Sequence, residues 1–223
     1  MNMKATMMRS KKEVLFEIDY HAHILPGCDH GSDSLETSLR QMAMAKAAGI
    51  RTICATPHFY PHEETMDHFL LKRARCYDEL QNHRADPLPK ILQGAEVLMC
   101  EGIDHMEHID RLCLQGTREL LFEMPLYRWS DQLIASVLCL HACGDLELIM
   151  AHADRYPAAD VELFIREGIK LQLNTDNLSK RFRNNHLTDW LKKGYVAYLG
   201  SDIHGTDIGY RYWNKCKKLQ KYW

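Results

Sequence analysis

Nine side chains with metal-binding groups follow directly on short apolar runs of the sequence. They are Asp19, His21, His23, His58, Glu96, Glu123, His152, Asp202 and His204. One histidine or carboxylate in such a position is usually a hydrogen-bonded or solvated group, but buried carboxylates and imidazoles that converge need compensating cations. Mixed imidazole and carboxylate ligands suit Mn²⁺, Fe²⁺ or Zn²⁺. Nine candidates are too many for one ion, so the sequence predicts a site for two or three divalent metal ions.

Two of these histidines, His21 and His23, are two residues apart. Side chains at this spacing point to the same side of a strand, so both can bind one ion. Asp19 lies two residues earlier on the same side, and we expect it to accept a hydrogen bond that fixes an imidazole tautomer. Glu96 and Asp202 are the candidates for a carboxylate that bridges two ions.

The expected ions indicate hydrolysis of a phosphate ester. Two adjacent divalent ions lower the pKa of a shared water and stabilise the attacking and leaving oxygens of an in-line displacement. Arg155 follows His152 by three residues, and its guanidinium either holds phosphoryl oxygens or forms a surface ion pair. None of the eight cysteines has an arginine six positions later. The sequence therefore lacks the phosphate-binding loop of thiol-dependent phosphatases.

The apolar runs alternate with longer segments of helical periodicity. The runs cover residues 14–19, 51–55, 90–96, 119–123, 147–152, 169–174 and 195–202, and the helical segments cover residues 35–48, 64–82, 130–143, 160–167 and 186–193. Asp33 and Glu36 have the spacing of a capping box for the first helix. This alternation predicts an α/β fold with parallel strands in a single domain.

Among such folds we expect a barrel of seven βα units. The alternative is a doubly wound open sheet, which normally has a glycine-rich first turn that is missing here. In parallel α/β folds the carboxyl ends of the strands meet at one rim, where active sites are assembled. Six of the seven expected strands deliver a candidate metal ligand to that rim.

The composition excludes several other classes of protein. The chain has 223 residues, of which 46% are hydrophobic and 26% are charged, and its net charge is −2. It is long enough for one substantial core, and no apolar stretch approaches the roughly 18 residues of a membrane-spanning helix. The first 12 residues carry four basic side chains and the last 13 carry five, neither with an acid, so residues 13–210 carry a charge of −11. This acidic body argues against nucleic acid as the main partner.

The expected compartment is the cytoplasm. The eight cysteines include no CxxC pair, and in a chain of this length they are best interpreted as reduced thiols. Residues 1–13 are basic but have no apolar segment typical of a signal peptide.

Seven short motifs occur in an order that is typical of one enzyme superfamily. They are His21-Ala22-His23 after Asp19, Ile24-Leu25-Pro26-Gly27, Ala55-Thr56-Pro57-His58, Gly94-Ala95-Glu96, Phe122-Glu123, Ala151-His152-x-x-Arg155-Tyr156 and Ser201-Asp202-x-His204. With these motifs the chain resembles the PHP (polymerase and histidinol phosphatase) superfamily over roughly residues 16–204. Within it, the Leu-Pro-Gly, Thr-Pro-His and His-x-x-Arg-Tyr sequences are similar to those of the bacterial metal-dependent tyrosine phosphatases of capsule and exopolysaccharide clusters, the CpsB/CapC type.

This resemblance implies a distorted (β/α)7 TIM-like barrel, the PHP fold, over residues 14–223, preceded by a basic extension over residues 1–13. It implies two or three divalent ions, usually manganese, with iron, zinc or magnesium as alternatives. The implied reaction is attack of a metal-activated hydroxide on the phosphotyrosine of a partner protein, the tyrosine-rich tail of a bacterial tyrosine autokinase.

The resemblance also implies roles for individual residues. His21, His23 and Asp202 would bind one ion, Glu96 would bridge to a second ion bound by His58 and His152, and Glu123 and His204 would hold a third. Arg155 would bind the substrate phosphate, and Asp202 would belong to the catalytic group as well as to the ligands.

Three departures from the family pattern are expected to matter. His30 stands where relatives usually have a carboxylate ligand of the third ion, so we include it among the ligands and expect it to change metal preference there. The second phosphate-binding arginine of the family is missing at its usual place, and Arg211 is the nearest candidate. The chain ends about 20 residues after His204, where relatives usually continue with another helix or two. We expect that difference to affect oligomerisation or stability.

Two alternative functions follow from the same residues. One is another PHP phosphoesterase, acting on histidinol phosphate, a nucleotide or a small sugar phosphate. The other is a catalytically impaired, metal-binding regulatory protein, which His30 and the displaced second arginine would favour.

Overall fold

The computed structural model describes residues 16–85, 87–180, 185–205 and 209–218, so the expected basic extension over residues 1–13 lies outside the described residues. The strands are β1 (Ile18–Ala22), β2 (Thr52–Ala55), β3 (His58–Phe59), β4 (Lys90–Gln93), β5 (Glu96–Leu98), β6 (Glu119–Glu123), β7 (Glu147–Met150), β8 (Lys170–Asn174) and β9 (Val196–Gly200). The α-helices are α2 (Leu35–Ala47), α3 (Met66–His83), α4 (Asp131–Ala142), α5 (Ala158–Arg166), α6 (Thr175–Lys180), α7 (Asn185–Lys192) and α8 (Trp213–Cys216). Short 3-10 helices are η1 (Ile103–His105), η2 (Ile109–Leu112), η3 (Ala153–Arg155) and η4 (Gly209–Tyr212).

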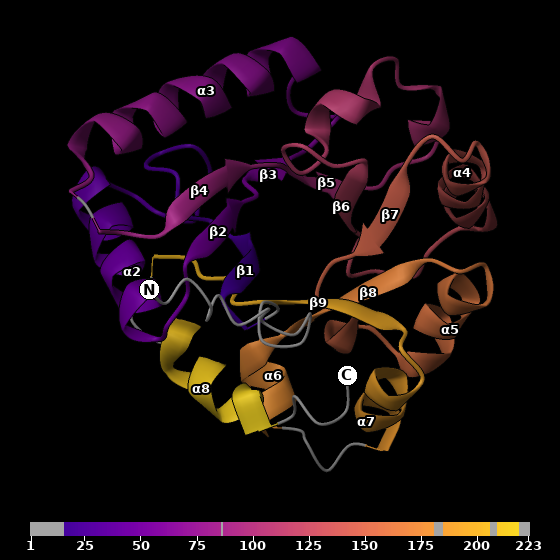
Figure 1. Cartoon of the computed structure of the whole chain (residues 1–223). Coiled ribbons are helices and arrows are strands. Elements are labelled where there is room, and N and C mark those ends of the chain that lie inside the picture. The colour runs from indigo at the N-terminus through magenta and orange to yellow at the C-terminus, as the bar shows by residue number, and fades with distance from the viewer. Residues whose placement is uncertain (1–15, 86, 181–184, 206–208, 219–223) are drawn as a thin grey trace, which may run out of the picture.

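The strands pair in parallel throughout the described residues. They form a three-stranded sheet with the order β1-β2-β4 and a six-stranded sheet with the order β3-β5-β6-β7-β8-β9. Figure 1 shows the strands around a common centre with the helices on the outside. Each of the seven expected strand regions contains a strand, which confirms the predicted α/β class with parallel strands.

The strand pairing does not close a barrel within the described part of the chain. The expected strand over residues 90–96 is divided into β4 and β5, and β2 is separated from β3 by Thr56 and Pro57. Proline has no amide hydrogen to donate, so the ladder is interrupted there. Isolated backbone hydrogen bonds cross the gaps, for example from Asp202 N to His21 O at 2.8 Å, between the ends of β9 and β1.

Hydroxyl side chains begin three of the helices, because each accepts a hydrogen bond from a backbone amide that the helix leaves unpaired. Ser34 caps α2, Thr65 caps α3 and Ser130 caps α4. The predicted capping box of Asp33 and Glu36 is therefore wrong by one residue at its first position. These caps start the helices directly after the loops that leave the rim.

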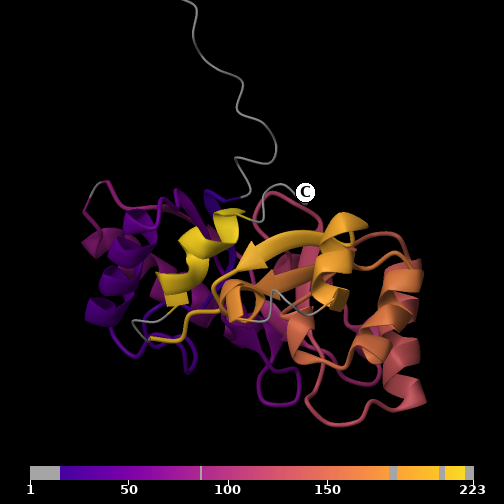
Figure 2. The ribbon, with the colours of Figure 1, turned by 90° about the horizontal axis from the view of Figure 1, so that it is seen from below.

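The C-terminal elements pack against the start of the chain. Figures 1 and 2 show α8 beside α2 and α6. The buried Trp213 donates a hydrogen bond from its indole nitrogen to the carbonyl oxygen of Phe16 at 2.9 Å, and Lys217 Nζ donates to Ala48 O at 3.1 Å. This packing fixes the entry to β1, the strand that carries His21 and leads directly to His23.

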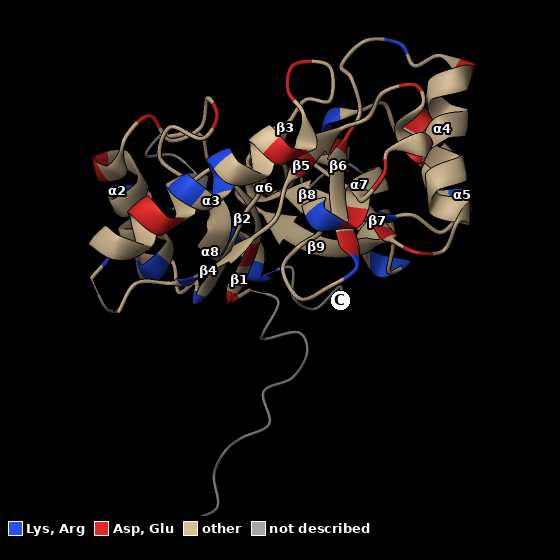
Figure 3. Cartoon of the chain, turned by 90° about the horizontal axis from the view of Figure 1, so that it is seen from above, with Lys and Arg blue, Asp and Glu red and all other residues tan. Residues whose placement is uncertain are grey.

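Three further findings concern membrane-spanning helices, surface charge and thiols. Among the helices that the structure describes, none is both long and apolar enough to cross a membrane. Acidic and basic residues are interspersed along the helices and loops of the described chain (Figure 3). All eight cysteines are free thiols in the structure, and their reduced state in the cell stays a prediction.

Candidate metal centre

The candidate ligands come from different strands and meet at one end of the sheets, where His58 and Glu96 follow the carboxyl ends of β2 and β4. His21 lies in β1 and His23 just after it, His58 begins β3, Glu96 begins β5, Glu123 ends β6, His152 follows β7, and Asp202 and His204 follow β9. His21, His23 and Glu96 have no exposed surface. Imidazoles and carboxylates buried this deeply need compensation by opposite charge. The structure thus brings together the residues that the sequence predicted to converge.

Four buried ligand atoms form the first cluster. His21 Nε2 and His23 Nε2 are 3.0 Å apart, and Glu96 Oε2 lies 3.1 and 3.2 Å from them. Asp202 Oδ1 lies 3.5 Å from His21 Nε2 and 3.4 Å from His23 Nε2. Ligand atoms about 2.0–2.2 Å from one ion in tetrahedral or octahedral geometry are themselves about 2.8–3.6 Å apart. These four atoms therefore have the spacing of ligands to a shared ion.

Hydrogen bonds on the far side of the two imidazoles set their tautomers. His21 Nδ1 lies 3.0 Å from Gln172 Oε1, and His23 Nδ1 lies 2.7 Å from Asp29 Oδ2. Both oxygens can only accept, so each ring donates from Nδ1 and turns Nε2 toward Glu96, where Nε2 holds either a proton or a metal ion. With neither bound, two imidazole nitrogens and two carboxylates would repel one another at these distances. A divalent cation resolves this arrangement, and the donor set fits one.

The second cluster contains His58, Glu96 and Glu123, with His152 beside it. His58 Nδ1 lies 3.1 Å from Glu96 Oε2 and 3.2 Å from Glu123 Oε1, while His152 Nε2 lies 2.7 Å from Glu96 Oε1. Among the described residues, His58 Nδ1 and Glu96 Oε2 are buried without a hydrogen-bond partner, as is Asp202 Oδ1. Because Glu96 belongs to both clusters, its position is that of a bridging ligand.

A third group is made of imidazoles alone. His23, His58 and His204 lie together, with 3.4 Å between His204 Nε2 and His58 Nε2. The His30 ring stacks at 4.6 Å from the His58 ring and 5.0 Å from that of His204, so it lies beside this group without joining it. The resemblance placed Glu123 with His204, whereas the structure places Glu123 with His58 and Glu96. The assignment of ligands to individual ions, including His30, stays a prediction.

The buried groups of the clusters shift one another's pKa values. Burial acts to raise the pKa of Glu96, but the nearby charge on His21 and the hydrogen bond with His152 outweigh it and hold this pKa well below its usual range. Burial acts to lower the pKa of His152, but hydrogen bonds to Glu123 and Glu96 raise it to about 9. Burial and the charge on His23 lower the pKa of His204 to about 4. At neutral pH, protons therefore compete with metal ions at His152 but not at His204.

Two candidate ligands have left-handed backbone conformations. His152 has φ 32° and Asp202 has φ 52°, and His108 is the third residue other than glycine with positive φ in the described chain. Such conformations cost about 1–3 kcal/mol each and persist where the surrounding structure enforces them. They turn the chain sharply at the ends of β7 and β9, which directs both side chains toward Glu96.

Asp19 supports the backbone rather than an imidazole. Its carboxylate accepts hydrogen bonds from the His21 amide at 3.2 Å, the Ser201 hydroxyl at 2.6 Å and the Tyr210 hydroxyl at 2.8 Å. We expected Asp19 to fix an imidazole tautomer, but Gln172 and Asp29 occupy those positions. Asp19 instead joins the ends of β1 and β9, because it binds groups on both sides of that gap.

The sequence did not predict the contribution of β8, which lies in the one expected strand region without a candidate ligand. Gln172 Oε1 accepts hydrogen bonds from His21 Nδ1 and, at 2.7 Å, from the His152 amide. Gln172 Nε2 donates to Asn174 Oδ1 at 3.0 Å, and Asn174 Nδ2 donates to Asp202 Oδ2 at 2.9 Å. The available signal was a pair of amide side chains at i, i+2 that alternates with the leucines of this strand. Through them β8 positions three ligands.

The two predicted phosphate-binding arginines have different surroundings. Arg155, in η3, contacts the Asp202 carboxylate, and its side chain is 41% exposed, so the guanidinium lies at the rim beside the cluster. Arg211 is exposed in η4. Within the described residues no contact joins Arg211 to the cluster, and its role stays a prediction.

The fold and the clusters together define a parallel α/β protein with a candidate multinuclear metal centre at the carboxyl ends of its strands. Residues 17–221 match the family model described as "Capsular polysaccharide synthesis, CpsB/CapC". The chain therefore belongs to the CpsB/CapC family, which confirms the resemblance seen in the motifs.

Two comparisons with individual proteins agree with this membership. The chain is 30% identical over 122 residues to the tyrosine-protein phosphatase YwqE of Bacillus subtilis (strain 168), and the match covers 52% of this chain and 47% of that protein. It thus spans about half the length of this curated relative. A solved structure from work on YwqE of Bacillus subtilis and CpsB of Streptococcus pneumoniae, named there as metal-dependent tyrosine phosphatases, matches with TM-score 0.69 and 20% identity. That match covers 91% of this chain and 93% of the other, and it shows a shared fold.

Proposed function

We propose that this protein is a metal-dependent phosphatase that hydrolyses phosphotyrosine in a partner protein. The observation that carries the proposal is the pair of ligand clusters sharing Glu96, with Arg155 at the rim beside them. Two adjacent ions and one cationic side chain form the set that in-line displacement at phosphorus needs. The names of the relatives, which include a tyrosine-protein phosphatase, support the phosphotyrosine substrate.

The residues of the chain have distinct tasks in this reaction. When bound, divalent ions would lower the pKa of a water molecule and stabilise the attacking and leaving oxygens. Arg155 holds a non-bridging phosphoryl oxygen once it leaves Asp202, since its guanidinium is partly exposed and adjacent to the cluster. A phenolate leaving group, with a pKa of about 10, needs less protonation than an alkoxide. A dedicated general acid is therefore dispensable.

Several finer points belong to the same proposal. We propose two or three divalent ions, manganese first, because the ligands are mixed imidazoles and carboxylates without a thiolate. We propose the tail of a bacterial tyrosine kinase as the partner and the cytoplasm as the compartment, with free thiols in support. We also propose that the two sheets are the halves of a distorted (β/α)7 barrel, because backbone hydrogen bonds cross both gaps.

The decisive experiment is elemental analysis of the purified protein together with turnover of a phosphotyrosyl peptide. We expect bound divalent metal and hydrolysis that a chelator abolishes and added Mn²⁺ restores. Histidinol phosphate and a sugar phosphate serve as competing substrates. Full activity in the chelator would refute the metal centre, and preference for a small phosphate would support the other phosphoesterase reading. Metal binding without turnover would support the regulatory one.

A further inference from the structure

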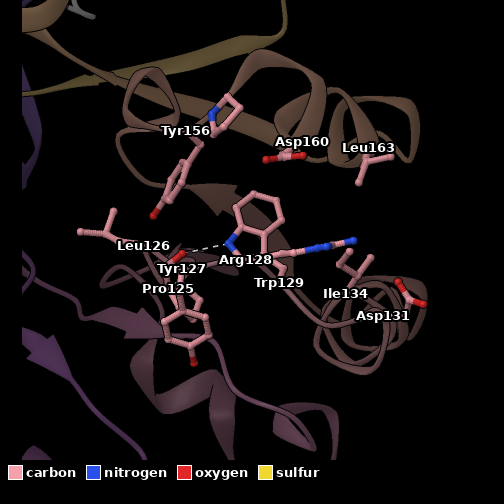
Figure 4. Close-up of a pocket in the computed structure, with 11 residues that line it drawn as sticks. Pro125, Leu126, Tyr127, Arg128, Trp129, Asp131, Ile134, Tyr156, Asp160 and Leu163 are labelled. Carbon is pink, nitrogen blue, oxygen red and sulfur yellow. Dashed lines mark hydrogen bonds between the residues drawn. The ribbon is translucent and has the colours of Figure 1, made fainter.

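An apolar hollow of about 440 Å³ lies next to the metal centre, between the loop after β6 and the start of α5. Figure 4 shows its lining, which includes Leu126, Tyr127, Trp129, Ile134, Tyr156 and Leu163. Four large apolar side chains are notably exposed in the described chain, and three of them, Leu126 (82%), Tyr127 (72%) and Leu163 (39%), line this hollow. Exposed apolar side chains gathered in one depression typically mark a binding site.

The hollow is continuous with the metal centre through Tyr156. The Tyr156 ring lies 5.8 Å from the ring of His152 on one side and 5.5 Å from that of Trp129 on the other. The Tyr156 hydroxyl donates to Met124 O at 2.7 Å and accepts from Met124 N at 3.0 Å, directly after Glu123. Trp129 Nε1 donates to Pro125 O at 2.9 Å. The wall that separates the hollow from the centre is therefore one side chain thick and rigid.

We propose that this hollow binds an uncharged aromatic or large aliphatic side chain of the substrate polypeptide, within three residues of the phosphotyrosine. This inference rests on the proposed phosphatase function and adds a specificity site to it. Successive residues of an extended peptide are about 3.3 Å apart, so a residue two positions away lies about 7 Å along the chain on the same side. That reach matches a depression one aromatic ring away from the centre.

The charges around the hollow disfavour acidic side chains, and its aromatic lining favours apolar ones. Asp131 of α4 and Asp160 of α5 line it, with Arg128 as the basic residue of the lining (Figure 4). Two carboxylates against one guanidinium disfavour an acidic or second phosphorylated side chain, since desolvating it beside like charge is costly. The half-buried Trp129 instead offers an aromatic surface to another ring. A neighbouring phenylalanine, unphosphorylated tyrosine or leucine fits these surroundings.

The test compares phosphotyrosyl peptides that have alanine at every flanking position with peptides that have one phenylalanine within three residues. At one or more positions we expect phenylalanine to lower KM roughly tenfold, the size of discrimination that an apolar pocket provides. In the Leu126→Ser/Tyr127→Ser variant, the ratio of KM between the alanine and phenylalanine peptides should fall to about one. Leu71→Ser, at a leucine of α3 that is 73% exposed and outside the hollow, is the matched control and should keep the ratio.

Three results would overturn the inference. One is an equal KM for all peptides in the unmodified protein while p-nitrophenyl phosphate is still hydrolysed. Another is persistence of the preference in the double variant. A third is a change in molecular mass of the double variant by light scattering without a change in preference, which would make the hollow a contact between copies. If neither peptide nor p-nitrophenyl phosphate is hydrolysed, the proposed function itself fails and this inference falls with it.

Discussion

The metal centre and the apolar hollow lie on opposite sides of Tyr156 and are built in opposite ways. The centre consists of charged and imidazole side chains from strand ends, several of them fully buried. The hollow combines apolar side chains with a few charged ones, all from loops and helix starts, and its Leu126 and Tyr127 are largely exposed. Burial of carboxylates and imidazoles in the centre is energetically costly without cations, whereas exposure of apolar side chains in the hollow is costly without a ligand. The centre therefore indicates a cation as its ligand, and the hollow indicates an apolar group.

This contrast assigns the reaction to the metal centre and the choice of peptide to the hollow. Strand ends are rigid and position reacting groups, while loops that follow them can vary and adjust to a substrate. Substitutions in the centre should therefore change turnover and metal content together. Substitutions in the hollow should change the relative use of peptides.

The largest expected effect concerns Asp202. Asp202→Ala removes a ligand of the first cluster and the partner of Arg155. We expect hydrolysis of p-nitrophenyl phosphate to fall about a thousandfold or more, equivalent to about 4 kcal/mol of transition-state stabilisation, and bound metal to decrease. Steady-state kinetics and elemental analysis measure both. Asp145→Ala, at a side chain that is 89% exposed, is the matched control. Equal activity of the two variants would remove Asp202 from the catalytic group.

The second prediction concerns pH, because protons and metals compete in the centre. A metal ligand must be neutral imidazole, and the raised pKa of His152, about 9, keeps that ring protonated at neutral pH. Metal affinity should therefore rise with pH up to about 9, by about tenfold per pH unit for each proton displaced. His204, whose pKa is lowered to about 4, is already neutral and adds no such dependence.

Calorimetric titration of the chelator-treated protein with Mn²⁺ at pH 6, 7 and 8 measures this slope, and buffers of different ionisation enthalpy report the released protons. The ratio of KM for alanine and phenylalanine peptides depends on apolar contact, so it should stay constant over the same range. An affinity that does not change between pH 6 and 8 would mean that His152 is not a ligand. If this ratio of KM values changed with pH in parallel with the metal affinity, the two regions would not be independent.

The two regions also differ in how far the sequence reveals them. His21, His58, Glu96 and Asp202 lie at or within three residues of the ends of runs that are recognisable by their apolar pattern, so their convergence follows from parallel strands alone. The hollow depends on a loop near residue 126 meeting a helix near residue 160, and no local pattern encodes that contact. The pairing gaps beside Pro57, which leave two sheets in place of a closed ladder, depend equally on tertiary structure.

The third prediction concerns Gln172, which lies in a strand region that the sequence predicts but makes contacts that it does not. Its amide accepts from His21 Nδ1 and from the His152 backbone, so Gln172→Met leaves both donors unpaired and the rings free to turn. Loss of such a supporting partner typically reduces metal affinity about 10–100-fold. Titration calorimetry with Mn²⁺ would show the loss, with the unfolding transition as a check that the variant folds.

Gln41→Met is the matched control for this substitution. Gln41 is as fully buried as Gln172, but its side-chain nitrogen and oxygen have no hydrogen-bond partner among the described residues. Replacing an unsatisfied amide with an apolar side chain of similar shape is neutral or stabilising by about 1 kcal/mol, and metal affinity should not change. Equal losses of metal affinity in both variants would show a general effect of the substitution and contradict a positioning role for Gln172.

The smallest expected effect tests the boundary between the regions. Tyr156→Phe removes the hydroxyl that binds both backbone groups of Met124, and these buried groups lose their partners at a cost of about 1–2 kcal/mol in the free energy of unfolding. Tyr127→Phe, at a side chain that is 72% exposed, should change it by less than about 0.5 kcal/mol. Denaturant titration distinguishes the two. If Tyr156→Phe also released metal, the hydroxyl would position Glu123 through its neighbour Met124. Tyr156 would then contribute to the metal centre as well as to the hollow.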